Sequence, residues 1–314
     1  MHSHHSHSGD YISHAEGQLE EMVLTAKKNG FTHFCLTEHM PRLDDMYLYP
    51  EEIDKKYTKL DLGENFERYL AHARKIQARE NALGDIKILV GYEVEGIDDA
   101  HIEAANLISE RTDMCVGSVH YVNHIPIDFN ADLWLKARES VGGTSRELYK
   151  EYFELQYRVL KTLKPAVVGH FDLIRLFDVK DHDPTTGKDF HARTIQQDWP
   201  DVWSLIVRNV NFVVEYGGLF EINGAAIRKG WETPYPQTDI AQEIIRQGGK
   251  FSLSDDSHTY AQIGLNYHKV WDYIVNTLHL ETIYHLDFDP TGAVTVVEDK
   301  TSELSLLSFW AQYK

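Results

Sequence analysis

Residues 31–39 read FTHFCLTEH, an apolar run that ends abruptly in a glutamate and a histidine. A short apolar run of this kind, bounded at its start by Gly30, is typical of a buried β-strand. The helical periodicity of residues 19–29 comes directly before it. Helices that alternate with buried strands favour βα units, so this stretch already points to a parallel sheet.

The same alternation of strands and helices continues along the chain. Further strands are predicted at residues 86–90 continuing to 93, 114–119, 166–168, 219–222, 251–254 and 293–297. Helices are predicted at residues 64–82, 146–163 and 240–246, whereas residues 212–216 fit either type. The pattern predicts a mainly parallel α/β fold, in one domain over residues 1–314. A polar insertion at residues 41–62 is expected to shape one side of a pocket.

Nearly every predicted strand is followed by a histidine or a carboxylate. These residues are His39, Glu93, His120, His170, Asp256 and His258. In barrels of parallel strands the C-terminal strand ends converge on one mouth, where catalytic groups collect. Imidazoles and carboxylates are ligands that suit zinc, iron or manganese. The absence of thiolates argues against a site for a soft metal or a purely structural site. We therefore expect a metal site at this mouth.

The N-terminal segment, MHSHHSHSGDYISHAEG, is rich in histidine. Its composition alone fits an expression tag or a low-complexity tract equally well. However, serines alternate with the histidines, and a His-x-His in an extended segment places both imidazoles on one face, where they can hold one metal ion. The segment offers two such pairs, His2 with His4 and His5 with His7.

The overall composition limits the class of partner. The formal net charge is −18, which repels nucleic-acid phosphates and anionic lipid, so we expect neither nucleic acid nor membrane as a partner. No apolar run approaches the roughly 20 residues that span a bilayer, and no secretory signal is expected. Cys35 and Cys115 lie in strand-like runs and are predicted to be buried free thiols, which fits a cytoplasmic location.

Six short motifs, in order along the chain, resemble those of the PHP (polymerase and histidinol phosphatase) phosphoesterases. They are His2-Ser3-His4, Thr37-Glu38-His39, Gly91-Tyr92-Glu93-Val94, Gly117-Ser118-Val119-His120, Gly169-His170-Phe171-Asp172 and Asp256-Ser257-His258. Three others resemble the histidinol-phosphate phosphatase branch of that family, particularly its fungal members. These are His14-Ala15-Glu16-Gly17, Glu221-Ile222-Asn223 with Arg228-Lys229, and Ser254-Asp255-Asp256-Ser257-His258.

The resemblance implies a distorted (β/α)7 TIM-like barrel with three metal ions at the C-terminal strand ends. The first ion is expected on His2, His4, Glu93 and Asp256, the second on Glu93, His120 and His170, and the third on His14, His39 and His258. We prefer His2 and His4 as the N-terminal pair, because Ser8 then falls where the family motif commonly carries a small residue. The family usually has a short strand before this motif, and only Met1 precedes His2, so His5 and His7 remain the alternative.

Phosphate binding requires positive charge beyond the metal ions. The resemblance implies a clamp by Arg228 and Arg175, because a guanidinium fork matches paired phosphate oxygens, although a surface salt bridge is the alternative for each. Arg42 is a weaker third candidate and His124 a possible substrate contact. We assign Glu221, Asn223 and Asp128 to the contact with the cationic end of a substrate. Glu95 is assigned the role of a supporting or alternative metal ligand.

The reaction that the resemblance implies is hydrolysis of L-histidinol phosphate to L-histidinol and inorganic phosphate. Metal-activated hydroxide would attack phosphorus without a covalent enzyme intermediate, with Asp256, His258 and Glu93 nearest the chemistry. Three alternatives stay open: a PHP phosphoesterase for another ester or nucleotide, an amidohydrolase-type C–N hydrolase, and a non-catalytic metal-binding regulatory barrel. The amidohydrolase type would require a lysine where Glu93 stands.

The other histidines are interpreted as surface or packing residues. They are His33, His72, His101, His182, His191, His268, His279 and His285. The sequence makes no prediction of the oligomeric state.

Overall fold

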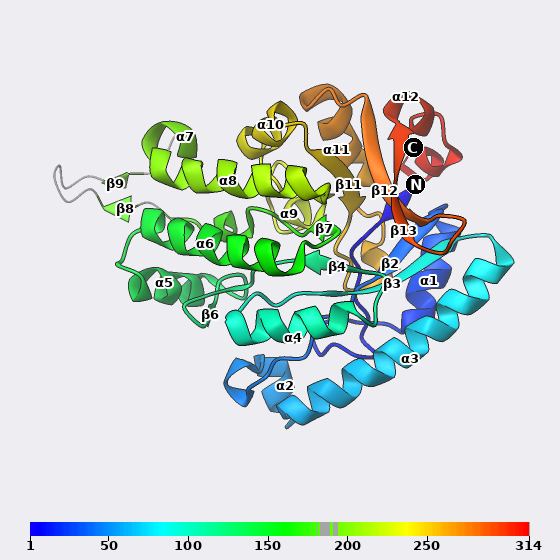
Figure 1. The fold of residues 1–314 in the computed structure, drawn as a ribbon, viewed down its shortest axis with the longest axis horizontal. Coiled ribbons are helices and arrows are strands. Elements are labelled where there is room, and N and C mark those ends of the chain that lie inside the picture. The colour runs from blue at the N-terminus through cyan, green and yellow to red at the C-terminus, as the bar shows by residue number, and fades with distance from the viewer. Residues whose placement is uncertain (180, 183–188, 191–193, 314) are drawn as a thin grey trace.

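The computed structural model describes residues 1–179, 181–182, 189–190 and 194–313, so His191 lies outside the described residues (Figure 1). Seven parallel strands form one sheet in the order β1-β2-β3-β4-β7-β10-β11. Their bounds are β1 His2–Ser3, β2 His33–Leu36, β3 Lys87–Glu93, β4 Met114–Gly117, β7 Val167–Val168, β10 Leu219–Asn223 and β11 Lys250–Ser254.

The two edges of this sheet meet and nearly close a barrel. The backbone N–H of His4 donates to the carbonyl of Leu253 at 3.1 Å, and Ser6 forms a parallel bridge with Ser257. The segment that follows β1 therefore pairs with β11 at the far edge. The predicted α/β barrel of parallel strands is confirmed.

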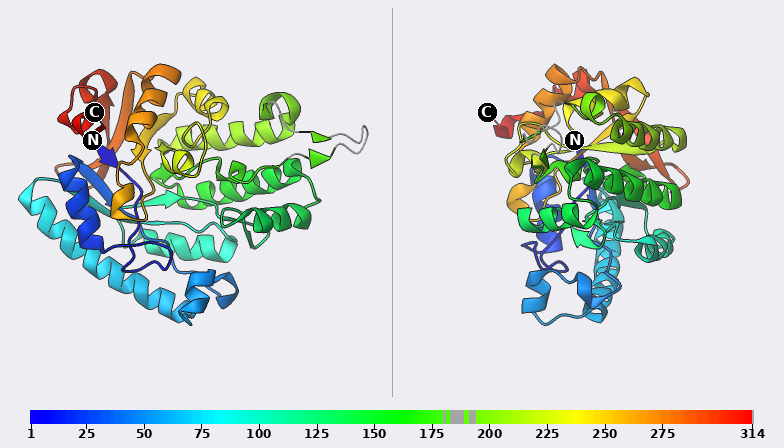
Figure 2. Two further views of the ribbon diagram at one scale, coloured as in Figure 1. Left: turned by 180° about the vertical axis from the view of Figure 1, so that it is seen from behind. Right: turned by 90° about the vertical axis from the view of Figure 1, so that its left-hand side faces the viewer.

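Helices surround the barrel (Figures 1 and 2). The longer ones are α1 Leu19–Lys28, α3 Lys59–Leu83, α4 Asp99–Ser109, α5 Ala131–Ser140, α6 Ser145–Leu163, α8 Pro200–Tyr216 and α10 Thr238–Arg246. Short helices are α2 Pro50–Asp54, α7 Ile195–Asp198, α9 Ala225–Arg228, α11 Tyr267–Asp272 and α12 Thr301–Leu304. There are 3₁₀ segments at Asp45–Tyr47, Leu173–Arg175, Tyr260–Gln262 and Ser308–Tyr313, and a π-helical segment at Tyr273–Thr277. Within the part of the chain that the structure describes, no helix is long and apolar enough to cross a membrane.

Several predicted elements differ from those in the structure. Residues 212–216 are the last turn of helix α8, and the insertion at residues 41–62 contains helix α2 and the start of α3. Helices α4 and α5 were not predicted, because their charged residues obscure the apolar spacing that packs them onto the barrel. The predicted strand at residues 293–297 is the first part of β13.

Three pairs of antiparallel strands accompany the barrel in the described part of the chain. They are β5 Tyr121–Val122 with β6 Ile125–Pro126, β8 Asp181–His182 with β9 Asp189–Phe190, and β12 Thr282–Phe288 with β13 Val294–Lys300. The β12–β13 hairpin lies at the base of the barrel, opposite the mouth. Its Leu286 packs with Cys35, Leu89, Met114 and other residues near the strand starts. Both Cys35 and Cys115 are buried free thiols, as predicted.

Tyr69 links helix α3 to the barrel and provides a test of the packing. Its side chain is fully buried, and its hydroxyl lies 2.6 Å from the carbonyl oxygen of Leu36 and 2.7 Å from that of Gly91. Tyr69→Phe removes this donor, so we expect a loss of about 1–2 kcal/mol in the free energy of unfolding. Urea denaturation measures it, with Tyr260→Phe as control because Tyr260 is 53 % exposed. Equal effects of the two substitutions would contradict the linking role.

Candidate metal centre

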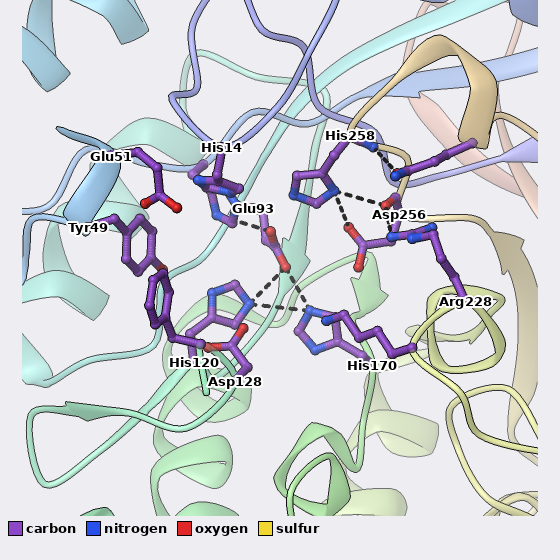
Figure 3. A pocket seen from close by; sticks show the side chains of 14 residues that line it. His14, Tyr49, Glu51, Glu93, His120, Asp128, His170, Arg228, Asp256 and His258 are labelled. Carbon is purple, nitrogen blue, oxygen red and sulfur yellow. Dashed lines mark hydrogen bonds and ion pairs between the residues drawn. The ribbon is translucent and has the colours of Figure 1, made fainter. Parts of the chain in front are cut away.

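The polar residues that follow the strands gather around one cavity at the barrel mouth (Figure 3). The cavity has a volume of about 260 Å³. All six predicted strand-end residues line it, together with His14 and Arg228. Because each parallel strand ends at the same edge, residues more than two hundred positions apart in the sequence lie side by side.

Glu93, the last residue of β3, lies at the centre of this cluster and is 1 % exposed. Its Oε1 lies 3.1 Å from Nε2 of His120 and 3.0 Å from Nε2 of His170. Its Oε2 lies 3.2 Å from both Nε2 of His5 and Nδ1 of His39. One carboxylate therefore faces two separate groups of imidazoles, which is the placement of a bridging ligand.

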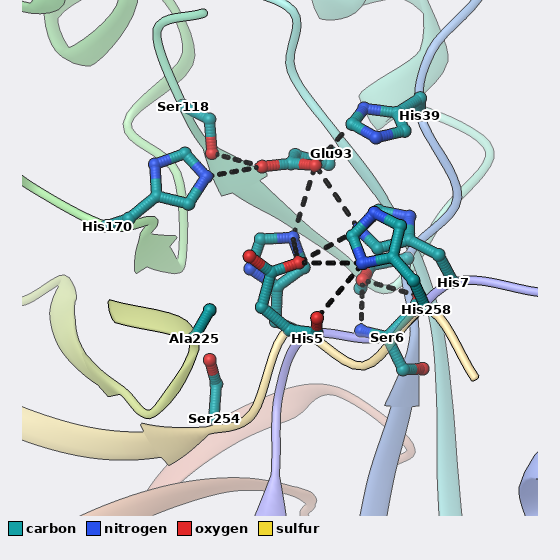
Figure 4. Close-up of polar contacts among 12 residues, drawn as sticks. His5, Ser6, His7, His39, Glu93, Ser118, His170, Ala225, Ser254 and His258 are labelled. Atoms are coloured by element: carbon teal, nitrogen blue, oxygen red, sulfur yellow. Dashed lines mark hydrogen bonds and ion pairs between the residues drawn. The ribbon is translucent and has the colours of Figure 1, made fainter. Parts of the chain in front are cut away.

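The second His-x-His pair, His5 and His7, lies at the mouth (Figure 4). Nε2 of His7 lies 3.3 Å from Oε2 of Glu93. The Nε2 atoms of His5 and His7 lie 3.7 and 3.5 Å from Oδ1 of Asp256. These are the contacts that the sequence analysis expected of His2 and His4.

The preferred pair, His2 and His4, lies at the base of the barrel, so the preference for it is corrected. Nε2 of His2 accepts the backbone N–H of Leu253, and Nε2 of His4 accepts that of Leu286, each at 2.9 Å. Neither imidazole is grouped with Glu93 or Asp256. Strand β1, His2–Ser3, contains the first histidine of the first pair and precedes the second pair.

Serines hold the second pair in place beside β2. The hydroxyl of Ser6 donates to the carbonyl of Cys35 at 2.7 Å, and its N–H donates to Oγ1 of Thr37 at 3.0 Å. The hydroxyl and N–H of Ser8 both donate to Oε1 of Glu38, at 2.6 and 2.9 Å. The alternation of serine with histidine thus reflects a fixed backbone, not a disordered tract.

A third group of imidazoles forms one side of the cavity. The ring of His14 lies 5.2 Å from the rings of both His39 and His258. One ring nitrogen from each of His7, His39 and His258 lies within 4.8 Å of the others. His14, His39 and His258 are therefore brought together as the sequence analysis expected.

The electrostatics of the cluster keep its acids ionised and divide its histidines into two groups, with raised and with lowered pKa. Burial alone would raise the pKa of Glu93, but His5 and His120 hold this pKa well below its usual value. The pKa of Asp256 is also low, since His5, His7 and His258 together outweigh burial. Burial lowers the pKa of His258 to about 3. Burial acts in the same direction on His5, His7 and His120, but their carboxylate neighbours outweigh it and raise the pKa of each, to about 10 for His7. Ionised carboxylates and neutral imidazoles are the forms that bind metal ions.

Unpartnered nitrogens test whether metal ions fit this site. Several buried ring nitrogens make no hydrogen bond of acceptable geometry to the described residues: Nε2 of His5, both nitrogens of His7, and Nδ1 of His14, His39 and His170. A buried polar atom without a partner costs about 1–3 kcal/mol. Divalent ions among these nitrogens and the carboxylates would satisfy them, and the donor types suit zinc, iron or manganese.

A further layer of carboxylates lies behind the histidines. Glu221 on β10 is fully buried, and its Oε2 lies 3.2 Å from Nδ1 of His5. Oε2 of Glu95 lies 3.4 Å from Nδ1 of His120. Such carboxylates orient metal-binding imidazoles through the second ring nitrogen. Glu221 and its hydrogen-bonded neighbour Asn223 therefore contact the ligand shell, and only Asp128 of the three residues predicted to meet a substrate lines the cavity.

Three arginines were predicted to bind phosphate, and of these Arg228 lines the cavity (Figure 3). Its Nη1 and Nη2 donate to the carbonyl oxygens of Asp255 and Asp256 at 3.0 and 2.9 Å. These bonds fix the guanidinium beside the residues that follow β11. Lys229, which was not predicted, also lines the cavity.

Arg42 does not reach the cavity and takes a structural role, contrary to the prediction. It is 3 % exposed and ion-pairs with Glu52 and, at 2.8 Å, with Glu95. Its guanidinium lies 4.2 Å from the ring centre of Tyr49. Burial of an arginine requires such acidic partners, and here they engage both Nη1 and Nη2.

Arg175 and His124 also lie elsewhere. Arg175 ion-pairs with Asp239 at 2.9 Å and with Asp172 at 3.3 Å, and it lines a different cavity. His124 is half exposed, and its Nδ1 lies 2.6 Å from the hydroxyl of Tyr47. The clamp by Arg175 was implied by the family resemblance, and a position in the sequence does not determine where a long side chain points.

Other residues of the cavity were missed by the sequence analysis. They are Tyr49, Glu51, Phe129, Lys229 and Gln262. Tyr49 and Glu51 come from the insertion at residues 41–62, which was expected to shape one side of the pocket. The rings of Tyr49 and Phe129 lie 6.2 Å apart and almost parallel, at 12°.

A parallel barrel with clustered histidines and carboxylates at its mouth defines a class of metal-binding α/β barrels. The model of the PHP domain matches residues 3–225, and the chain belongs to that family. It is 38 % identical to the histidinol-phosphatase of Saccharomyces cerevisiae, over 99 % of both chains. It is 39 % identical to a probable histidinol-phosphatase of Schizosaccharomyces pombe, over 99 % of this chain and 96 % of that one.

A solved structure shares the fold. It is histidinol phosphate phosphatase from Lactococcus lactis, complexed with zinc, L-histidinol and phosphate. The TM-score is 0.62 at 18 % identity, and the match covers 90 % of this chain and 95 % of the other.

Metal content distinguishes the two N-terminal histidine pairs. We expect His5→Ala and His7→Ala to lower the zinc bound per chain after reconstitution, because each removes a nitrogen that faces Glu93 and Asp256. His2→Ala is the matched control and should retain the full zinc content. Elemental analysis of desalted protein provides the measurement, with circular dichroism to verify folding. Zinc loss in His2→Ala, with full zinc content in His5→Ala and His7→Ala, would instead favour His2 and His4 as the ligand pair.

Proposed function

We propose that this chain is a histidinol-phosphatase, which hydrolyses L-histidinol phosphate to L-histidinol and inorganic phosphate. The observation that carries the proposal is 38 % identity to a histidinol-phosphatase over 99 % of both chains. The cluster of histidines and carboxylates around a cavity of about 260 Å³ supports it, since a small phosphate ester is the size of substrate such a cavity admits.

The cluster would hold three divalent ions. The first would be bound by His5, His7, Glu93 and Asp256, the second by Glu93, His120 and His170, and the third by His14, His39 and His258. Zinc in the Lactococcus lactis structure supports zinc as one of them. When bound, such ions supply Lewis-acid polarisation of the phosphoryl group and activation of water near neutral pH.

The residues of the chain position the phosphate and balance its charge. Arg228 stands beside Asp256 at the edge of the cavity and would bind phosphoryl oxygens as charge develops on them. Lys229 adds a second cation at the same edge. Glu93 and Asp256 keep their ionised form at neutral pH, so neither gives up the ligand role by taking a proton. No side chain needs to form a covalent intermediate.

The opposite side of the cavity suits the cationic end of histidinol. Asp128 and Glu51 bring acidic groups to that side, where the amino group or a protonated imidazole would gain charge-assisted hydrogen bonds. The nearly parallel rings of Tyr49 and Phe129 offer flat apolar faces for the imidazole. A strongly acidic protein can therefore bind this phosphate ester, since its substrate carries positive charge as well.

Phosphate release from L-histidinol phosphate tests the proposal directly. We expect fast release that a chelator abolishes and Zn²⁺ or Mn²⁺ restores, because the ligand set depends on bound ions. Nucleotides and sugar phosphates, assayed in parallel, should release little, since they lack the cationic end that Asp128 and Glu51 face. Preferential release from nucleotides would shift the assignment to another phosphoesterase of the family, and no release from zinc-loaded protein would indicate a binding role.

Substitution of Arg228 tests the phosphate-binding role. Arg228→Ala should lower kcat/KM by about 10²–10³-fold, as expected for loss of one positioned charge stabiliser, while Arg228→Lys should retain more activity. Zinc content is measured alongside, because Arg228 also holds the carbonyls of Asp255 and Asp256. Arg246→Ala is the control, since that side chain is 65 % exposed on helix α10. Activity close to wild type in Arg228→Ala would rule the clamp out.

A further inference from the structure

A second cluster of histidines and carboxylates lies at the base of the barrel, at the opposite end from the mouth. Strands β1, β2, β12 and β13 contribute His2, His33, His285, Asp287 and Asp299, and His4, which follows β1, lies beside His2. None of them lines the cavity at the mouth, and none has a part in the proposed reaction. The sequence analysis interpreted His33 and His285 as surface or packing residues.

Three residues of this cluster are arranged as a set of metal ligands. One ligand atom from each of His33, His285 and Asp287 lies within 4.8 Å of the others. Nε2 of His33 lies 3.4 Å from Oδ2 of Asp287, and the rings of His33 and His285 lie 4.1 Å apart. Two imidazoles and one carboxylate leave at least one position for water, which suits a site near the surface.

Hydrogen bonds leave the required lone pairs of this triad free. Nδ1 of His285 lies 2.6 Å from Oδ2 of Asp299, so it carries the proton and leaves the lone pair on Nε2. A carboxylate that accepts the second N–H of an imidazole is the usual support of a metal-binding histidine. Oδ1 of Asp287 accepts the backbone N–H of Phe288 at 2.7 Å, which leaves Oδ2 available.

His33 contributes a buried nitrogen that the described residues do not satisfy. Its Nε2 makes no hydrogen bond of acceptable geometry, although the side chain as a whole is 15 % exposed. Nδ1 contacts the hydroxyl of Thr32 at 3.1 Å, so His33 has a local partner on one side and faces Asp287 with the other. Burial lowers the pKa of His33 to about 4, which keeps the imidazole neutral.

His2 and His4 are excluded as ligands by their own hydrogen bonds. Each accepts a backbone N–H at Nε2, so the proton of each neutral ring sits on Nδ1. A protonated Nδ1 cannot bind a metal ion, and that of His2 lies 4.0 Å from Asp299. The rings of His2 and His4 therefore anchor β11 and β12, and His33 and His285 remain as the histidine ligands of the proposed site.

We propose that His33, His285 and Asp287 bind one divalent transition-metal ion, for which zinc fits best, at a second site separate from the mouth. This ion joins strand β2 of the barrel to the β12–β13 hairpin, whose two strands pair from Thr282 to Lys300. The two side-chain types match zinc, and the hairpin brings its ligands from residues far along the chain. The ion stabilises the base of the barrel and takes no part in turnover.

Zinc stoichiometry tests this second site. Wild type, His33→Ala, Asp287→Asn and the exposed control His268→Ala are loaded with Zn²⁺, desalted and subjected to elemental analysis. We expect His33→Ala and Asp287→Asn to lose about one zinc per chain relative to wild type and His268→Ala, because each removes one ligand. Phosphate release by these variants should stay unchanged, and the rise in Tm that added Zn²⁺ causes should be smaller.

The Glu93→Gln variant separates zinc bound at the mouth from zinc bound at the base. In Glu93→Gln, which removes the carboxylate shared by two of the mouth sites, adding Asp287→Asn should lower the remaining zinc by about one per chain. Asp287→Asn preserves the shape of the side chain, so a folded variant is expected even where His33→Ala is unstable. Equal zinc content in wild type and Asp287→Asn would overturn the proposal, whichever substrate the mouth hydrolyses. Loss of phosphate release with unchanged zinc content would overturn it as well.

Discussion

The structure depends on burying ionised carboxylates at the mouth of a barrel. Glu93 is 1 % exposed, and removal of a charge from water is costly unless opposite charges and hydrogen bonds compensate. The histidines around Glu93 supply this compensation, either as protonated rings where carboxylates raise their pKa or as lone pairs that bind cations. This requirement explains why His39, His120 and His170 follow their strands at one level, each directed at Glu93.

The same constraint determines what the surrounding residues can do. Glu95 and Glu221 orient His120 and His5 from behind, which brings two more buried acids to the mouth. Arg42 ion-pairs with Glu95, so this arginine balances the supporting acids and is not free for phosphate. Arg228 instead donates to two carbonyl oxygens, which leaves its positive charge without a carboxylate partner in the contacts described.

The sequence predicted those parts of the site that local pattern determines. Each strand end could be read from an apolar run followed by His39, Glu93 or His120, because parallel strands bring such ends together. The partners of long side chains could not be read, since Arg175 meets Asp239 only after α10 packs near the turn at Leu173–Arg175. The cluster at the base was missed for the same reason, because His33 and Asp287 are 254 positions apart (287 − 33).

The N-terminal histidines show how a shift of three residues along the chain changes which pair meets Glu93. In a continuous strand, side chains alternate between two faces, so His2 and His4 would lie on the face opposite to His5 and His7. This alternation applies only as far as the strand continues. Strand β1 does end, at Ser3, and Ser6 pairs with Ser257 beyond it. The first pair then accepts backbone N–H groups at the base, while the second meets Glu93 at the mouth. A repeated His-Ser pattern thus supplies both the anchor of the first strand and two residues of the candidate metal site, and the point where that strand ends separates the two pairs.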